Sequence, residues 1–389
     1  MKRLTPIIAL MSVFMLACCF VVFGASAENI KATLGVGAAE IGLILSVFLY
    51  TAMVVQFFIG AVTDRIGHKP IALVGFIVTG VCMFLISAAV SMSLLLTAAV
   101  LLGIGAMCLN TVGNTIIPQV LFEGKDPARA SNFGNGFFGL GLFVTPLIIN
   151  YFPSAPQGGL IFLAAINAFL LILSLFTVFP KANLGYKFST GFKLLGQAPV
   201  FIAALALLCY IGLENSMNGW IAQYMTELFR NTGFEGPLAM KRAGTVLSAF
   251  GLSMAIGRFI TAGVKNLTAT GVKLIIAVSA VAAVSIFVMY LTSSPIIAIV
   301  AVIVTGLSFA PVFPTVVGVT FSKYEPQYYG SIFGMIFAIG LFGGGILQNL
   351  IGGMAGESVQ SSLFIPAIVA IILLLVALFM GKAKAKPVD

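Results

Sequence analysis

A glutamate lies inside a long apolar stretch of this sequence, within the segment CYIGLENSMNGW. Between residues 199 and 229 the only charged residues are Glu214 and Glu227. An ionised carboxylate near the middle of a membrane costs about 2.5 kcal/mol or more, and burial favours its neutral, protonated form. A carboxyl group in such a place can therefore take up and release a proton. The i, i+4 spacing puts Tyr210 and Asn218 on the same helix face as Glu214.

Two interpretations of Glu214 stay open. In the first, the carboxyl group titrates as its cavity opens to water, and it couples proton movement to solute movement. In the second, it stays protonated or pairs with a basic residue, and it only joins helices. Glu214 lies 15 residues after Pro199, which places it about 22 Å into a helix, at or beyond the membrane midplane. Arg258 is expected two turns or more from such a site, as part of a gate or a charge pair.

Other polar side chains in apolar segments are candidates for binding the hydroxyl groups of a solute. Trp220 is the only tryptophan; its ring can pack on the C–H face of a sugar, or it can anchor the chain at a membrane boundary. Amide side chains in such segments either line a cavity or bond neighbouring helices, and we favour the cavity. The predicted solute-binding residues are Asn110, Asn114, Asn135, Glu214, Asn218, Trp220 and Gln348.

The composition indicates that these residues lie in a membrane. The chain of 389 residues is 60% hydrophobic and only 8% charged, which is typical of a protein that crosses a membrane many times. Its net charge is +9, but the basic residues are scattered over short loops. We therefore expect membrane lipid, and no nucleic acid, as the partner of this charge.

Twelve apolar runs are long enough to cross a bilayer. The predicted spans are 5–27, 39–62, 70–90, 93–119, 130–152, 158–179, 199–229, 242–263, 271–291, 295–321, 328–352 and 360–380. The first run follows two basic residues and resembles a secretory signal, but its length of about 20 residues favours a retained helix over a cleaved one.

The basic residues also predict orientation. If the N-terminus is cytoplasmic, 15 of the 20 Lys and Arg residues fall on the cytoplasmic side. We therefore predict a multi-pass protein of the cytoplasmic (inner) membrane with both termini in the cytoplasm. The predicted domains are an N-terminal six-helix bundle (1–180), a basic connector (181–198) and a C-terminal six-helix bundle with a short basic tail (199–389).

The two halves resemble each other. Residues 105–141 align without gaps to residues 306–342, with an acidic, proline-containing loop between two glycine-rich helices in each copy. Few residues are identical, but the pattern supports two parallel repeats. The predicted fold class is an all-α membrane protein of twelve transmembrane helices, arranged as two six-helix bundles related by pseudo-twofold symmetry.

A short motif, GAVTDRIGHKP at residues 60–70, stands between the second and third spans. It resembles the G-x-x-x-D-R-x-G-[RK]-[RK] signature of the major facilitator superfamily, except that His68 replaces a basic residue. The resemblance implies that Asp64 approaches the start of the eleventh helix, near residues 328–334, and holds the carrier closed on the cytoplasmic side. Alternatively, the charged residues only solvate a loop. The predicted gate residues are Gly60, Asp64, Arg65, Gly67, Lys69 and Arg258.

Within that superfamily, four segments resemble the fucose-permease-like sugar carriers. They are YIGLENSMNGW, GLSMAIGR, GLSFAPVFPT and GGGILQNLIG. Fucose-permease carriers use acidic residues in their first and fourth helices, and here Ala32 and Asn110 align with those positions. The solute or its coupling is therefore expected to differ.

The expected function is secondary active transport. We predict a monomeric carrier that moves a small polar solute by alternating access with proton coupling, and a sugar is the leading hypothesis for this solute. A proton-driven exporter of drugs or metabolites is an alternative, and a receptor or membrane enzyme that does not transport is another. The single histidine, His68, and the lack of a nucleophile–base set give no reason to expect a metal, a cofactor or an enzyme.

Overall fold

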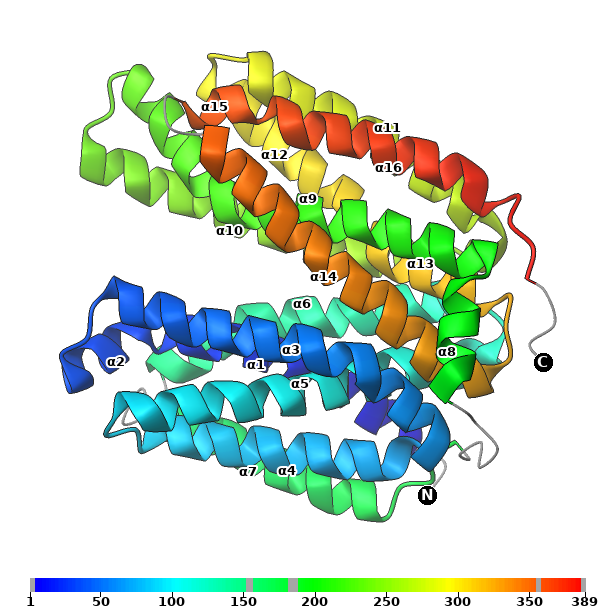
Figure 1. The fold of residues 1–389 in the computed structure, drawn as a ribbon. Coiled ribbons are helices and arrows are strands. Elements are labelled where there is room, and N and C mark those ends of the chain that lie inside the picture. The colour runs from blue at the N-terminus through cyan, green and yellow to red at the C-terminus, as the bar shows by residue number, and fades with distance from the viewer. Residues whose placement is uncertain (1–3, 152–156, 181–187, 355–357, 386–389) are drawn as a thin grey trace. The chain divides into compact units, whose positions relative to one another are not determined.

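The computed structural model describes residues 4–151, 157–180, 188–354 and 358–385 (Figure 1). Its regular structure is helical, with no strand among these residues. The α-helices are α1 (Leu4–Ala25), α2 (Ala27–Leu34), α3 (Ala38–Ile66), α4 (His68–Ser87), α5 (Met92–Val120), α6 (Pro127–Tyr151), α7 (Gln157–Leu175), α8 (Phe188–Leu195), α9 (Ala198–Asn231), α10 (Gly236–Ala262), α11 (Leu267–Leu291), α12 (Pro295–Phe309), α13 (Val312–Phe321), α14 (Tyr329–Met354), α15 (Val359–Ser362) and α16 (Phe364–Met380). Two 3₁₀ turns, Leu121–Gly124 and Pro326–Tyr328, follow α5 and precede α14.

Twelve helical segments among the described residues are long and apolar enough to cross a membrane. The predicted number of spans is therefore confirmed. The tenth span is divided into α12 and α13, because Pro311 has no N–H to donate and its ring disfavours an unbroken helix. The short helices α2 and α8 were not predicted.

The second span continues further than the sequence suggested. Helix α3 runs through Asp64 and Arg65 to Ile66, and α4 begins at His68. The predicted loop is therefore wrong: Gly67 alone separates the two helices. Its φ of 89° is a conformation that glycine adopts without strain, and its N–H closes α3 by donating to the carbonyl of Thr63 at 2.8 Å.

The chain divides by packing into two compact units. Unit 1 contains residues 1–125, 137–192 and 325–335, and unit 2 contains residues 126–136, 193–324 and 336–389. The first turns of α6 and of α14 thus belong to a different unit from the rest of the same helix. The predicted domain boundaries at 180 and 199 stay a prediction.

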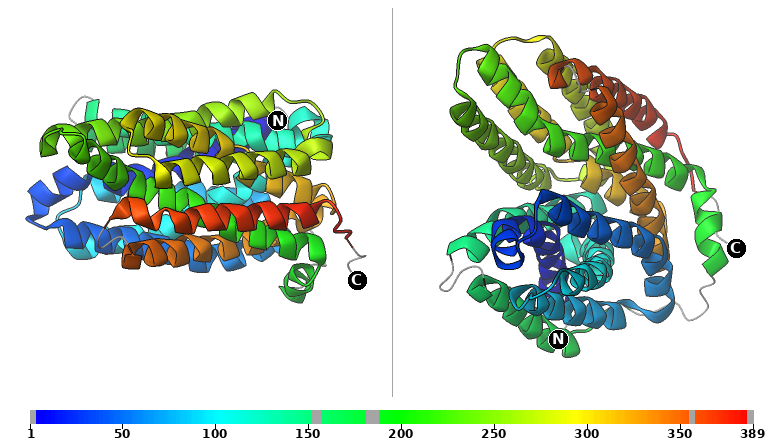
Figure 2. Two further views of the ribbon diagram at one scale, coloured as in Figure 1. Left: turned by 90° about the horizontal axis from the view of Figure 1, so that it is seen from above. Right: turned by 60° about the vertical axis from the view of Figure 1, so that its left-hand side comes forward.

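Each unit is organised around one deeply buried helix. In unit 1, α5 packs against α1, α3 and α4, and α4 also packs against α7 (Figure 1). In unit 2, α9 packs against α10, α13 and α16, and α11 packs against α12 and α16; Figure 2 shows these helices from two further sides. Polar side chains on α5 and α9 consequently have to find partners inside their own unit.

Candidate functional site

Helix α9 positions the glutamate that the sequence singled out. Pro199 stands in the first turn of α9, where its missing N–H is not needed, and the helix then continues without a break through 34 residues. Tyr210 and Glu214 follow each other by one turn on this helix. Asn218, a further turn along, is exposed.

Glu214 forms an ion pair with Arg258 of α10. The Oε1 atom of Glu214 lies 3.3 Å from Nη2 of Arg258, and the side chains are 22% and 4% exposed, respectively. Arg258 also donates from Nη1 to the main-chain oxygen of Asn135 at 3.4 Å. A buried guanidinium is stable only when it is paired, so these contacts explain how α10 tolerates Arg258. The expectation that Arg258 lies two turns away from Glu214 is wrong, because the two side chains meet between their helices.

An aromatic wall encloses this pair in unit 2. The ring of Tyr210 is fully buried and packs against Phe309 and Phe313, with centroid distances of 5.9 and 6.4 Å. Its hydroxyl lies within electrostatic range of the Glu214 carboxylate and the Arg258 guanidinium. The tyrosine hydroxyl therefore lies together with the two charged groups inside unit 2.

Two other predicted binding residues contact each other. The indole N–H of Trp220 donates to Oε1 of Gln348 at 2.7 Å, and Nε2 of Gln348 donates to the main-chain oxygen of Asn215 at 2.7 Å. The contact joins α9 to α14 within unit 2. The structure thus brings Trp220 and Gln348 together and satisfies the indole N–H within the protein.

The amides of α5 form a network inside unit 1. Asn110 donates to Oε1 of Gln56 at 3.0 Å and accepts from Nδ2 of Asn114 at 2.9 Å. Gln56 donates in turn to the hydroxyl of Thr111 at 3.4 Å. Gln56 is not among the predicted residues, although it is the one amide in the run MVVQFFIG, one turn before Gly60. Within unit 1 these amides bond α5 to α3.

Asn135 belongs to unit 2 rather than to this network. Its side chain is buried and donates to the main-chain oxygen of Ser131 at 3.0 Å, one turn earlier in α6. Its own main-chain oxygen is the acceptor for Arg258. The predicted solute-binding residues are consequently divided between the two units.

Asp64 binds the start of α14 within unit 1. Its carboxylate accepts from the main-chain N–H groups of Gly330 and Ser331 at 2.9 and 2.7 Å, and from the hydroxyl of Ser331 at 2.6 Å. Gly60 makes this approach possible, because a Cβ atom there would overlap the carbonyl of Gly330. The positive end of the α14 dipole favours the carboxylate.

The remaining residues of the motif lie at the same helix ends. Arg65 is exposed, and Lys69 donates to the carbonyl of Leu175 at the end of α7 at 2.8 Å. His68 is buried, with Nε2 2.8 Å from the hydroxyl of Thr115. That hydroxyl already donates to the carbonyl of Thr111 at 2.6 Å, so the histidine nitrogen is the donor. His68 therefore packs in the interior of unit 1, at the start of α4 and not in the predicted loop.

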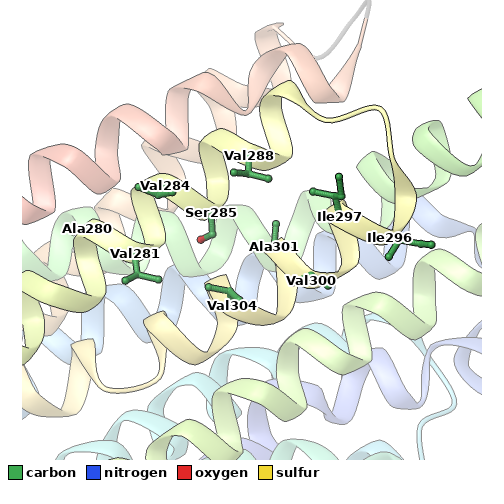
Figure 3. A pocket seen from close by; sticks show the side chains of 10 residues that line it. All are labelled: Ala280, Val281, Val284, Ser285, Val288, Ile296, Ile297, Val300, Ala301 and Val304. Carbon is green, nitrogen blue, oxygen red and sulfur yellow. The ribbon is translucent and has the colours of Figure 1, made fainter.

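A groove of about 540 Å³ opens between α11 and α12 (Figure 3). Its lining includes Val284, Ile296 and Val300, which are 64%, 74% and 56% exposed. The hydroxyl of Ser285 in its wall already bonds to Thr305 at 2.8 Å. With apolar walls on a membrane-spanning segment, this groove suits lipid chains and offers little to bind a polar solute.

Comparison with known proteins decides the family. The model of the Major Facilitator Superfamily matches residues 8–348, which is most of the chain. This chain belongs to the major facilitator superfamily. It is therefore a multi-pass membrane transporter, and the predicted fold class, an all-α membrane protein with twelve transmembrane helices in the major facilitator fold, is confirmed.

Solved structures of the superfamily share this fold at low sequence identity. The transporter FucP in its outward conformation is 18% identical, with a TM-score of 0.79 over 96% of this chain and 97% of that chain. A second structure of FucP, the Escherichia coli fucose:proton symporter, gives a TM-score of 0.77 at 18% identity over 97% and 99% of the two chains. The proton:xylose symporter XylE gives 0.71 at 14% identity over 97% and 94%.

Curated relatives carry a different name. The multidrug resistance protein MdtL of Shewanella oneidensis is 30% identical over 120 residues, which is 31% of this chain and 30% of the relative. MdtL of Citrobacter koseri is 32% identical over 108 residues, or 28% and 27% of the two chains. These alignments thus span less than a third of the relatives' own length.

Proposed function

We propose that this superfamily member carries a small polyhydroxy solute, with a sugar as the first choice, across the cytoplasmic membrane by alternating access and together with a proton. The observation that carries the proposal is the Glu214–Arg258 ion pair, which lies beside the hydroxyl of the buried Tyr210. The fold neighbours named as symporters of fucose and xylose support the same class of solute.

Glu214 is the proposed coupling group. While it is ionised, it holds Arg258 at 3.3 Å. Protonation removes its charge, so Arg258 loses its partner and the pair can separate. The protonated carboxyl group can then bond to the Tyr210 hydroxyl one turn away. Proton binding would in this way favour one conformation of the carrier over the other.

The proposed solute site uses polar side chains of α6, α9 and α14 in unit 2. Asn218 is exposed on the same face of α9 and is free to meet a hydroxyl group. Trp220 and Gln348 can contribute by exchanging their mutual hydrogen bond for bonds to the solute. Asn135 is placed next to Arg258 by its main chain.

For Asn110 and Asn114, binding has a structural cost. Both are buried, and they bond to each other and to Gln56. A solute hydroxyl would have to replace one of these hydrogen bonds. This exchange requires the network to open during the transport cycle. We therefore propose that they hold α3 and α5 together in the present conformation.

The test is uptake into proteoliposomes driven by an inward proton gradient, with a panel of radiolabelled monosaccharides. Wild type and the variant Glu214→Gln are compared, with Glu325→Gln as the control, because Glu325 is an exposed carboxylate outside the site. Gradient-driven accumulation by wild type and the control, with only exchange in Glu214→Gln, supports the proposal. Accumulation that survives a protonophore would remove the proton from it.

A second candidate is export of drugs or metabolites. The aligned segments of MdtL, a multidrug resistance protein, favour it. It predicts that deletion of the gene makes cells sensitive to hydrophobic cations and leaves growth on sugars unchanged. Absence of flux for every sugar in the panel, together with that sensitivity, would favour the exporter.

The remaining features of the proposal concern the cellular setting. We propose that the chain works as a monomer in the cytoplasmic membrane with both termini in the cytoplasm, as the distribution of basic residues indicates. Labelling of single cysteines from either side of the membrane tests the orientation.

A further inference from the structure

A second carboxylate binds the start of a helix, within unit 2. Asp126 lies directly before α6 and is 8% exposed. Its two oxygens accept from the main-chain N–H groups of Leu267 and Thr268, both at 2.9 Å, from the hydroxyl of Thr268 at 2.7 Å and from the N–H of Arg129 at 3.3 Å. The Thr268 hydroxyl in turn accepts from the N–H of Ala128 at 3.0 Å.

This arrangement has the same donors as the one around Asp64. There, two consecutive N–H groups and a serine hydroxyl at the start of α14 bind the carboxylate; here, two consecutive N–H groups and the Thr268 hydroxyl at the start of α11 do so. In both cases the carboxylate precedes the seventh span in the sequence, and the helix belongs to the last six spans. The positive end of each helix dipole favours the anion.

Further contacts hold the first turns of α6. Arg129 donates from Nε to the carbonyl of Ala262, the last residue of α10, at 2.8 Å. Asn132 donates to the hydroxyl of Thr315 in α13 at 2.9 Å. The start of α6 is thus bonded to the end of α10, the start of α11 and the middle of α13.

An apolar cluster lies behind these polar contacts. Ala128, Leu267 and Val319 are buried against one another, with exposures of 0%, 0% and 4%. Gly318 lets α6 approach this closely, because a Cβ atom there would overlap the main chain of Ala128. Val319 is covered by Ala128 of α6 and by Leu267 of α11, so water reaches it only when this packing on α13 opens.

The Asp126 carboxylate is charged under ordinary conditions. Burial by itself raises the pKa of this group, but the hydrogen bonds from Thr268, Leu267 and Arg129 outweigh it and hold the pKa below the ordinary value of 3.8. Hydrogen bonds to a charged group are stronger than those between neutral groups. The contact is therefore made by an ionised acceptor.

We propose that Asp126 is a second latch of the carrier, which holds the start of α6 against α10, α11 and α13 and must release it in every transport cycle. Alternating access requires segments of the first and the last six spans to separate on one side of the membrane. The bonds of Asp126 join such segments, so they must break when that side opens. This inference rests on the alternating access of the proposed function, but it does not depend on the identity of the solute or on proton coupling.

The test measures how often Val319 is exposed. A Val319→Cys reporter is placed in a chain whose five native cysteines, all buried, have been replaced. A membrane-impermeant maleimide is applied to right-side-out and everted vesicles. Asp126→Asn should raise the labelling rate roughly tenfold or more from one side, because charged hydrogen bonds of the closed state are lost. Glu123→Gln is the matched control, since Glu123 is an exposed carboxylate in the same connection.

A reporter in the other unit distinguishes a latch from general unfolding. Ala98 of α5 is fully buried, so an Ala98→Cys reporter should stay unlabelled in Asp126→Asn. Thr268→Val, which removes one of the donors, should give a smaller increase at Val319. Equal labelling of Val319→Cys in Asp126→Asn and Glu123→Gln would overturn the proposal. Labelling at Ala98 that rises together with Val319 would also overturn it, because Asp126 would then only stabilise the fold.

Discussion

The Glu214–Arg258 pair makes a prediction that a double-mutant cycle can measure. We consider Glu214→Gln, Arg258→Met and the double variant. At 3.3 Å, opposite charges interact by about 5 kcal/mol in an environment with an effective dielectric constant of about 20. Because Glu214 is 22% exposed and the pair has one close contact, we expect a coupling energy of roughly 2–3 kcal/mol. The loss of stability in the double variant should therefore be smaller than the sum of the losses in the two single variants.

The assay is reversible unfolding of the purified carrier in mixed micelles. The control cycle uses Glu123→Gln and Lys125→Met, because that ion pair is exposed, with side chains 77% and 79% accessible. Its coupling energy should stay between about 0 and 1 kcal/mol. If the buried cycle gives no larger coupling than the exposed one, the reasoning that Glu214 neutralises a buried Arg258 is refuted.

Three further predictions concern other contacts. Gly60→Ala should destabilise the carrier by roughly 2 kcal/mol or more, because the added methyl group would overlap the main chain of α14. Gly42→Ala in the same helix is the control: its methyl group would enter open space, so the change should be neutral or stabilising by up to about 1 kcal/mol. Thermal unfolding compares the two variants. Asn110→Ala should cost roughly 1–3 kcal/mol in the same assay, since it leaves Gln56 with a lost partner, and a loss within about 0.5 kcal/mol would contradict the network. The stabilisation from Asp126 is present above the ordinary pKa of an aspartate and is lost only as the pH falls through the lowered pKa of Asp126 in the folded state. The labelling rate of the Val319→Cys reporter is therefore compared with and without Asp126→Asn. The ratio of the two rates should be constant between about pH 5 and 8. A ratio that falls across this range would contradict it.

The sequence predicted the spans well, because membrane crossing depends on local composition. A run of about 20 apolar residues is stable mainly as a helix that crosses the membrane, and all twelve predicted spans are present. The end of α3 was misplaced for the same reason: Asp64 and Arg65 are charged, so hydropathy ended the span before them, yet both continue the helix.

The partners of the polar residues could not be predicted from spacing. The i, i+4 rule gave the shared face of Tyr210 and Glu214, but not the contact with Arg258, which lies 44 residues later. Gln348 is 128 residues from the indole that donates to it. Such contacts depend on how whole helices pack, and the sequence gives the faces of each helix without their pairing.

The hydrogen bond between the sole tryptophan, Trp220, and Gln348 gives this carrier an intrinsic optical probe. Emission near the red end of the protein spectrum comes from one indole, so no labelling is needed to follow it. Its N–H is bound at 2.7 Å between α9 and α14, and a change in that contact alters the environment of the excited ring. Tryptophan fluorescence of the unmodified chain can therefore report, in real time, a solute or proton that changes this part of unit 2.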